Sequence, residues 1–134
     1  MAVYFNNVKL SSLKYNDLDI NTLNFNGKNY KLIDIVTASC TFNGGSISSF
    51  NSSDSSIIYQ NSSKVYFTKS GKLTLYVNGA NNVTTYKNNT QIGYTTSGSG
   101  YKATYNINIT AGDYIRFNSN VGGNTASFTF EPQF

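Results

Sequence analysis

The chain of 134 residues has no histidine, no tryptophan and a single cysteine, Cys40. Without histidine, Ser-His-Asp and Cys-His catalysis are excluded, and the commonest metal ligand is missing. One cysteine excludes an internal disulfide and thiolate-rich metal sites. We therefore expect a protein that is not an enzyme, has no metal site and needs no cofactor. Cys40 lies in the alternating run from Ile35 to Phe42, which predicts a small buried side chain rather than a nucleophile.

Charge is also scarce, since charged residues make up 12% of the chain and the formal net charge is +4. The lysines are scattered singly and Arg116 is the lone arginine. No basic stripe for nucleic acid is present, so we expect no nucleic-acid partner. No apolar run approaches the roughly 20 residues that span a membrane, and the first residues lack the pattern of a signal peptide. We expect no membrane association and synthesis in a host cytoplasm without secretion.

The few acidic residues offer weak candidates for chemistry. Asp17 and Asp19 have the spacing of neighbours on one strand face, which a paired-carboxylate glycosidase site would need, but a polar strand face is the favoured interpretation. Asp54, in a serine-rich loop, could help hold calcium, yet no loop concentrates the several carboxylates that such a site prefers. We expect Asp113 to stabilise its own turn through its side chain.

A ten-residue repeat occupies the first 33 residues. An aromatic residue recurs at positions 5, 15 and 25, and each is followed by asparagine. Asn26-Gly27 is a strong signal for a two-residue hairpin turn, and Asn6-Asn7 and Asn16-Asp17 are weaker forms of it. Residues 3–33 are therefore predicted to form a small β-meander of short strands.

This meander is too small to hold a core of its own, so it must pack against a surface. We favour a partner protein and assign residues 1–35 to an N-terminal docking segment. The candidate docking side chains are the recurring apolar and aromatic ones: Val3, Phe5, Leu13, Tyr15, Leu23 and Phe25.

The remainder, residues 36–134, shows strand signals every eight to twelve residues. Clear alternation runs through Lys72–Val77, Tyr101–Thr110, Asp113–Phe117 and Thr125–Phe130, and weaker strands are expected at 46–50, 57–60, 64–68 and 83–87. Short polar segments separate them, and no stretch has the pattern of a helix. The prediction is an all-β protein, in which an antiparallel, jelly-roll-like β-sandwich of roughly eight strands follows the meander.

Tyrosine is the abundant aromatic residue, with 11 copies. Tyrosines near predicted loops could form a platform on which sugars stack, but half-burial on sheet faces is the favoured interpretation. The candidate ligand-binding residues are Tyr59, Tyr86, Tyr94 and Tyr101.

Two resemblances accompany these patterns. The hairpin repeat that begins Val3-Tyr4-Phe5-Asn6-Asn7 resembles the start of virion structural proteins in tailed phages of low-GC Gram-positive bacteria. The segment from Ile107 to Phe117 resembles the penultimate hairpin of jelly-roll tips in the tumour-necrosis-factor (TNF) and C1q-like group. The second resemblance implies a homo-oligomer, with a trimer as the expected form.

Together these features predict a non-enzymatic virion structural protein displayed on the particle surface. Its length suits capsid decoration or an accessory role, with other capsid or tail proteins as partners. The alternative is a tail or baseplate receptor-binding module that recognises host surface saccharide. A bacterial adhesin domain is disfavoured because an export signal is missing.

Overall fold

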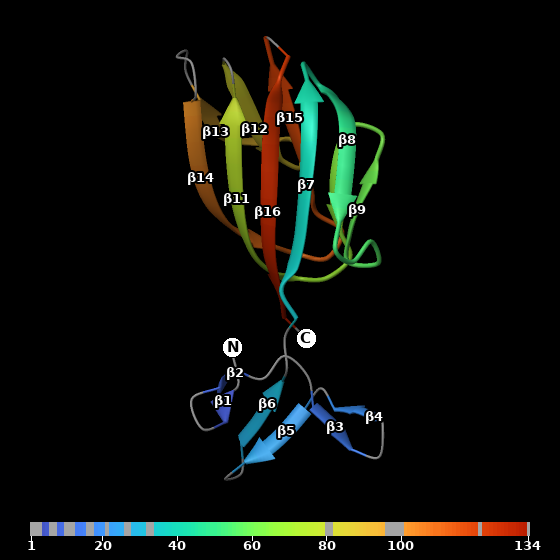
Figure 1. Ribbon diagram of the computed structural model, residues 1–134. Helices are drawn as coiled ribbons and strands as arrows, with labels where there is room; N and C mark the ends of the chain where they lie inside the picture. Colours follow the sequence, from blue (N-terminus) through green and yellow to red (C-terminus); the bar gives the residue numbers. More distant parts are fainter. Residues whose placement is uncertain are drawn as a thin grey trace.

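A computed structural model describes residues 34–79, 82–95, 101–120 and 122–133, with Tyr101 described by its backbone alone. It also describes the backbone of six short strands before residue 32. Every described element is a β-strand (Figure 1). No helix of the described chain could cross a membrane.

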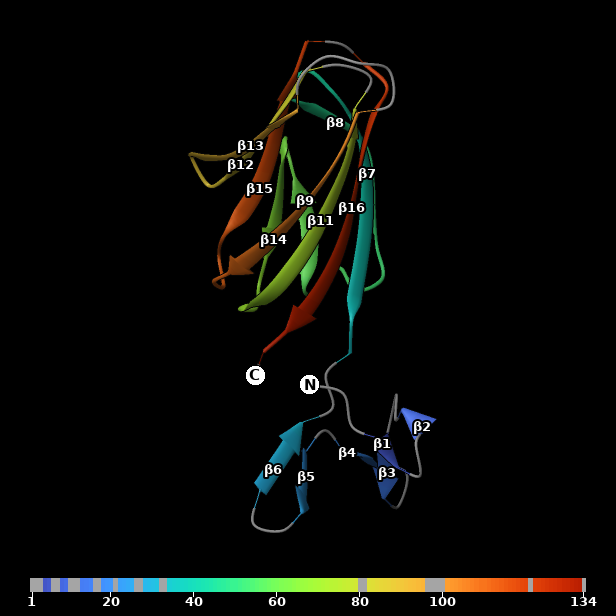
Figure 2. The ribbon, with the colours of Figure 1, turned by 90° about the vertical axis from the view of Figure 1, so that its left-hand side faces the viewer.

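Ten strands form a sandwich of two antiparallel five-stranded sheets, seen as two layers in Figure 2. The first sheet has the order β14-β11-β16-β7-β8, and the second has the order β13-β12-β15-β10-β9. The strands of the first sheet are β7 (Val36–Asn43), β8 (Ser46–Ser52), β11 (Gly71–Gly79), β14 (Tyr101–Ile109) and β16 (Asn124–Pro132). Those of the second are β9 (Ile58–Asn61), β10 (Lys64–Phe67), β12 (Val83–Lys87), β13 (Thr90–Thr95) and β15 (Tyr114–Ser119). The predicted all-β sandwich is confirmed, with ten strands instead of roughly eight.

Strict alternation of apolar and polar residues puts one side of each sheet in the core. β7 and β11 alternate buried and exposed positions along nearly their whole length. Phe42 stacks on Phe117 of the opposite sheet with ring centroids 4.4 Å apart, and Phe67 meets Phe130 edge-on at 5.1 Å. Because sheet side chains have a period of two, the residues between these buried ones point outward on both sheets.

Several tight turns depend on residues that tolerate positive φ. Asn88, between β12 and β13, has φ of 54°, and Gly44, between β7 and β8, has φ of 58°. Asparagine and glycine adopt this conformation at low cost, so these two short polar segments form the turns that were predicted there.

The N-terminal repeat forms three separate hairpins that contribute no strand to the sandwich (Figure 1). The paired strands are β1 (Tyr4–Phe5) with β2 (Val8–Lys9), β3 (Leu13–Tyr15) with β4 (Leu18–Ile20), and β5 (Thr22–Phe25) with β6 (Lys28–Lys31). Each pair flanks one of the three predicted turn dipeptides, which confirms the hairpins. The pairs form three two-stranded sheets, so in the described residues the expected meander is a series of hairpins.

The candidate docking side chains lie outside the described residues. Val3 is not described, and Phe5, Leu13, Tyr15, Leu23 and Phe25 are described by their backbone only. The docking segment of residues 1–35 therefore stays a prediction.

Candidate binding surface

Among the described residues, no group of histidine, cysteine, aspartate or glutamate side chains is placed to hold a metal. Cys40 is buried on β7 at 4% exposure, as predicted. Burial raises the pKa of its thiol to about 12, despite an opposing backbone hydrogen bond from Ala126. A thiol with so high a pKa is not a nucleophile near neutral pH. Asp54 uses its carboxylate to accept hydrogen bonds from Ser56 in its own loop.

The outward side of the second sheet carries most of the tyrosines whose side chains the structure describes. Tyr59 on β9, Tyr86 on β12 and Tyr94 on β13 were candidates, and all three lie there. Tyr59 and Tyr94 are exposed, and Tyr86 is half-buried. The side chain of Tyr101 lies outside the described residues. We call this surface the tyrosine–cation face; it is made by Tyr59, Lys64, Tyr66, Tyr86, Tyr94, Tyr114 and Arg116.

Three of these tyrosines form a row across neighbouring strands. Tyr66 of β10 is in register with Tyr59 of β9 on one side and with Tyr114 of β15 on the other. The Tyr59 and Tyr66 rings stack at 5.4 Å between centroids, and the Tyr66 and Tyr114 rings are tilted at 5.3 Å. Such contacts fix the rings against the sheet while leaving part of their surface open to water.

Two cations follow in the adjacent row. Lys64 is two residues before Tyr66, and Arg116 is two residues after Tyr114, so in this antiparallel pair they fall at neighbouring positions. Lys64 Nζ lies 4.5 Å from the centroid of the Tyr114 ring, and the Arg116 guanidinium lies 3.8 Å from that of Tyr86. The rings thus hold both positive charges on the face by cation–π contacts.

The turn before β15 anchors one end of this face. Asp113 Oδ2 accepts a hydrogen bond from the Thr110 amide at 2.8 Å and lies 3.2 Å from Lys87 Nζ, and Oδ1 accepts one from Asn88 Nδ2 at 2.9 Å. Burial acts to raise the pKa of Asp113, but these hydrogen bonds and the Lys87 charge outweigh it and lower the pKa. Asp113 therefore stabilises its own turn, as predicted.

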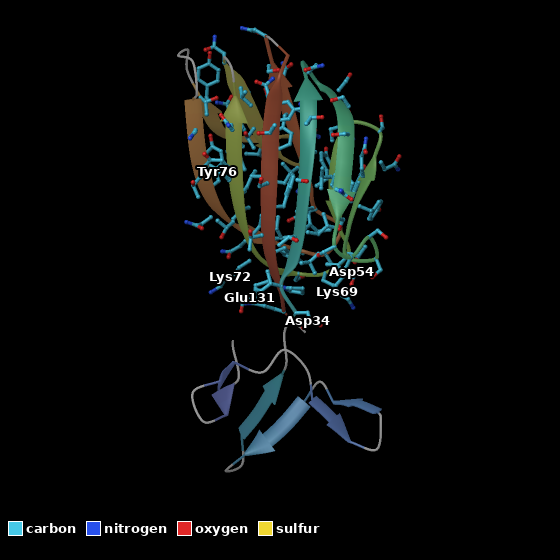
Figure 3. All side chains as sticks on the ribbon, in the orientation of Figure 1. Asp34, Asp54, Lys69, Lys72, Tyr76 and Glu131 are labelled. Atoms are coloured by element: carbon cyan, nitrogen blue, oxygen red, sulfur yellow. The ribbon has the colours of Figure 1, made fainter. Side chains whose placement is uncertain are left out.

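The outward side of the first sheet has a different character, because short hydroxyl side chains cover its β7 and β16 strands. Thr37, Ser39 and Thr41 of β7 are in register with Thr129, Ser127 and Thr125 of β16. We call this surface the hydroxyl face; it is made by Thr37, Ser39, Thr41, Thr74, Thr125, Ser127 and Thr129. It faces the viewer in Figure 3, where Tyr76 is labelled beside it on β11. A shallow hollow of about 490 Å³ between β7, β8 and β16 is lined mainly by hydroxyl groups.

Sequence reasoning missed four members of the tyrosine–cation face: Lys64, Tyr66, Tyr114 and Arg116. The alternation of apolar and polar residues could have identified them. It is the same in Lys64-Val65-Tyr66-Phe67 and in Tyr114-Ile115-Arg116-Phe117. In both strands the second and fourth residues are buried, so the first and third point to the outward side of the sheet. Only the folded structure shows that these two strands are neighbours in the sheet.

The strand order and the two layers define a TNF-like jelly-roll β-sandwich. Similar solved structures are GITRL ectodomains of the TNF family: GITRL from bushbaby (TM-score 0.61, 16% identity, 75% of this chain and 98% of that chain) and rabbit GITRL (0.55, 16%, 71% and 93%). Pika GITRL matches with a TM-score of 0.53 and 21% identity, over 72% of this chain and 95% of its own. No family model and no curated protein sequence matches the chain. Likeness at these identities shows the fold, and confirms the jelly-roll expectation for the C-terminal part.

Proposed function

We propose that this protein is a non-enzymatic structural protein of a tailed-phage virion, displayed on the particle surface as a capsid decoration or accessory protein. The observation that carries the proposal is the pairing of the N-terminal hairpins, each of which closes within itself and takes no strand from the sandwich. An isolated two-stranded hairpin is marginally stable in water, so these hairpins need another surface. Another virion protein supplies it, and the sandwich faces outward.

The proposal includes self-association. The resemblance of the C-terminal part to TNF and C1q-like tips supports a homo-oligomer, with a trimer as the expected form. Light scattering of the purified full chain measures this directly, as a mass that is a multiple of 14.7 kDa.

Particle attachment is tested with virions of the encoding phage from which this protein has been deleted. The full-length protein should bind these particles in sedimentation, and a variant with Phe5, Tyr15 and Phe25 changed to serine should not. A control variant with Tyr76→Thr, on the sandwich, should bind as the wild type does. Absence of the protein from wild-type virions by mass spectrometry, or equal binding by the hairpin variant, would reject the docking role.

A receptor-binding module that recognises host surface saccharide is the second candidate. The specific observation in its favour is the grouping of tyrosines on one outward face, with Tyr59, Tyr66 and Tyr114 in one row. Partly exposed aromatic rings offer surfaces against which the apolar faces of sugar rings can pack.

A further inference from the structure

Lys64 and Arg116 present two like charges side by side on the tyrosine–cation face. Like charges at neighbouring positions of adjacent strands repel each other, so the arrangement costs free energy unless something compensates. The tyrosine rings beneath them compensate in part. An anion lying against both groups would relieve the remaining repulsion.

The described part of the chain supplies no such anion. Its carboxylates belong to Asp34, Asp54, Asp113 and Glu131, and none forms an ion pair with Lys64 or Arg116. Asp113 is close in sequence to Arg116, but its carboxylate is taken by Lys87, Asn88 and Thr110. On the other sheet, by contrast, Lys72 is in register with Glu131. The pair of cations is therefore a feature of the tyrosine–cation face alone among the described sheet faces.

The aromatic row beside the cations indicates which chemical class of ligand would fit this face. A simple polyanion would gain nothing from the rings of Tyr59 and Tyr66, and a neutral sugar would gain little from the charges. Tyr59 is 37% exposed, so its ring is open to a ligand at the edge of the sheet. A ligand that has both apolar ring faces and a negative group uses every part of this surface.

We propose that the tyrosine–cation face binds an acidic saccharide. Its sugar rings pack along the row of Tyr59, Tyr66 and Tyr114 and stack on the exposed Tyr59 ring at the edge of the sheet. Its carboxylate, phosphate or sulfate group lies against Lys64 and Arg116. The inference deepens the second candidate function and rests on it for its biological meaning. Binding by the isolated chain can be measured whether or not the protein is part of a virion.

The experiment measures binding of the full-length protein to immobilised polysaccharides in 0.15 M NaCl. The acidic probes are polygalacturonate, dextran sulfate and dextran phosphate; the comparison probes are uncharged dextran and poly-L-glutamate, a polyanion without sugar rings. We expect at least one acidic polysaccharide to bind about ten-fold more tightly than either comparison probe, and the binding to weaken as salt is added.

Two pairs of matched variants locate the site. K64Q/R116Q should weaken binding of the acidic polysaccharide about ten-fold, whereas K72Q/K102Q, which removes the same charge from the opposite sheet, should change it less than two-fold. Tyr59→Thr should weaken binding and Tyr76→Thr should not, although the two tyrosines are exposed to nearly the same extent, 37% and 36%. Circular dichroism and thermal unfolding of each variant control for folding.

Three results would overturn the inference: no acidic polysaccharide bound more tightly than uncharged dextran, poly-L-glutamate bound as tightly as the acidic polysaccharides, or equal losses in the two double variants. Particle attachment is scored separately, so a protein that binds acidic saccharide but is absent from virions would reject the proposed function and keep this site.

Discussion

The two outward faces of the sandwich are built on the same alternating backbone pattern but carry different side chains. The hydroxyl face repeats short threonine and serine pairs such as Thr37 with Thr129, while the tyrosine–cation face sets large rings and two cations at equivalent positions. The shared core dictates which residues point inward on both sheets and leaves the outward residues free. The grouping of partly exposed rings on one face is the feature on which the proposed ligand site rests.

A substitution in the core between the two sheets should have the largest effect on stability. Phe128 of β16 is 1% exposed and lies between Phe67 and Phe117 of the opposite sheet. Phe128→Ala should lower the free energy of unfolding by about 3–5 kcal/mol, because a cavity replaces the ring. Denaturant unfolding followed by tyrosine fluorescence and by circular dichroism should show one coincident, shifted transition. Separate transitions for the two probes would contradict a common core.

A substitution at the contact that joins the two sheets at one edge should have the second-largest effect on stability. The ring of Tyr105, on β14, packs directly over Gly93 of β13, where an added Cβ would overlap the ring. Gly93→Ala should therefore destabilise the protein by about 1–3 kcal/mol through overpacking. Gly45→Ala is the matched control, since its added Cβ meets nothing closer than 3.8 Å. Similar thermal midpoints for the two variants would show that the Tyr105 contact is not tight.

The outward sides of the two sheets are compared by removing one tyrosine from each. Tyr66 contacts the rings on both sides of it, whereas no ring contact is found for Tyr76 among the described residues. Tyr66→Thr should cost about 1 kcal/mol of stability, the worth of aromatic pairing, and Tyr76→Thr should cost less. The free energy of unfolding in urea measures both. The reverse order would remove the distinction drawn between the faces.

The smallest effect concerns the turn that anchors the tyrosine–cation face, and it depends on pH. Because the pKa of Asp113 is lowered in the folded protein, its carboxylate stabilises the fold above the unfolded pKa of about 3.9. That contribution is lost as the pH falls through the folded pKa. Asp113→Asn should be less stable than the wild type at pH 6, and the difference should shrink below about pH 4. A difference in thermal midpoint that stays constant down to pH 2 would argue against the ionised carboxylate.

The sandwich was largely predictable because alternation survives in most of its strands. Val83–Lys87 was predicted with the bounds observed for β12. β13 was missed, since Gln91-Ile92-Gly93-Tyr94 does not alternate cleanly, and the register shifts opposite it between Thr85 and Tyr86. A bulged edge strand loses the period of two on which the prediction depends.

The tyrosine–cation face was predictable only in pieces. Tyr59, Tyr86 and Tyr94 were predicted as ligand-binding candidates, but nothing local to any of them indicates its neighbours. The row of tyrosines forms because β15 lies next to β10, a pairing between segments far apart in the sequence. Periodicity shows which way a side chain points, and the strand order decides what it lies beside.

The most direct test of binding at the tyrosine–cation face is a titration of the ¹⁵N-labelled full-length protein with an oligogalacturonate, followed by NMR. We expect amide shifts to move on β9, β10, β12 and β15, around Tyr59, Lys64, Tyr66 and Arg116, while those of β7 and β16 stay in place. Shifts confined to the hydroxyl face, or no shifts at millimolar ligand, would contradict the claim that the tyrosine–cation face is the binding surface.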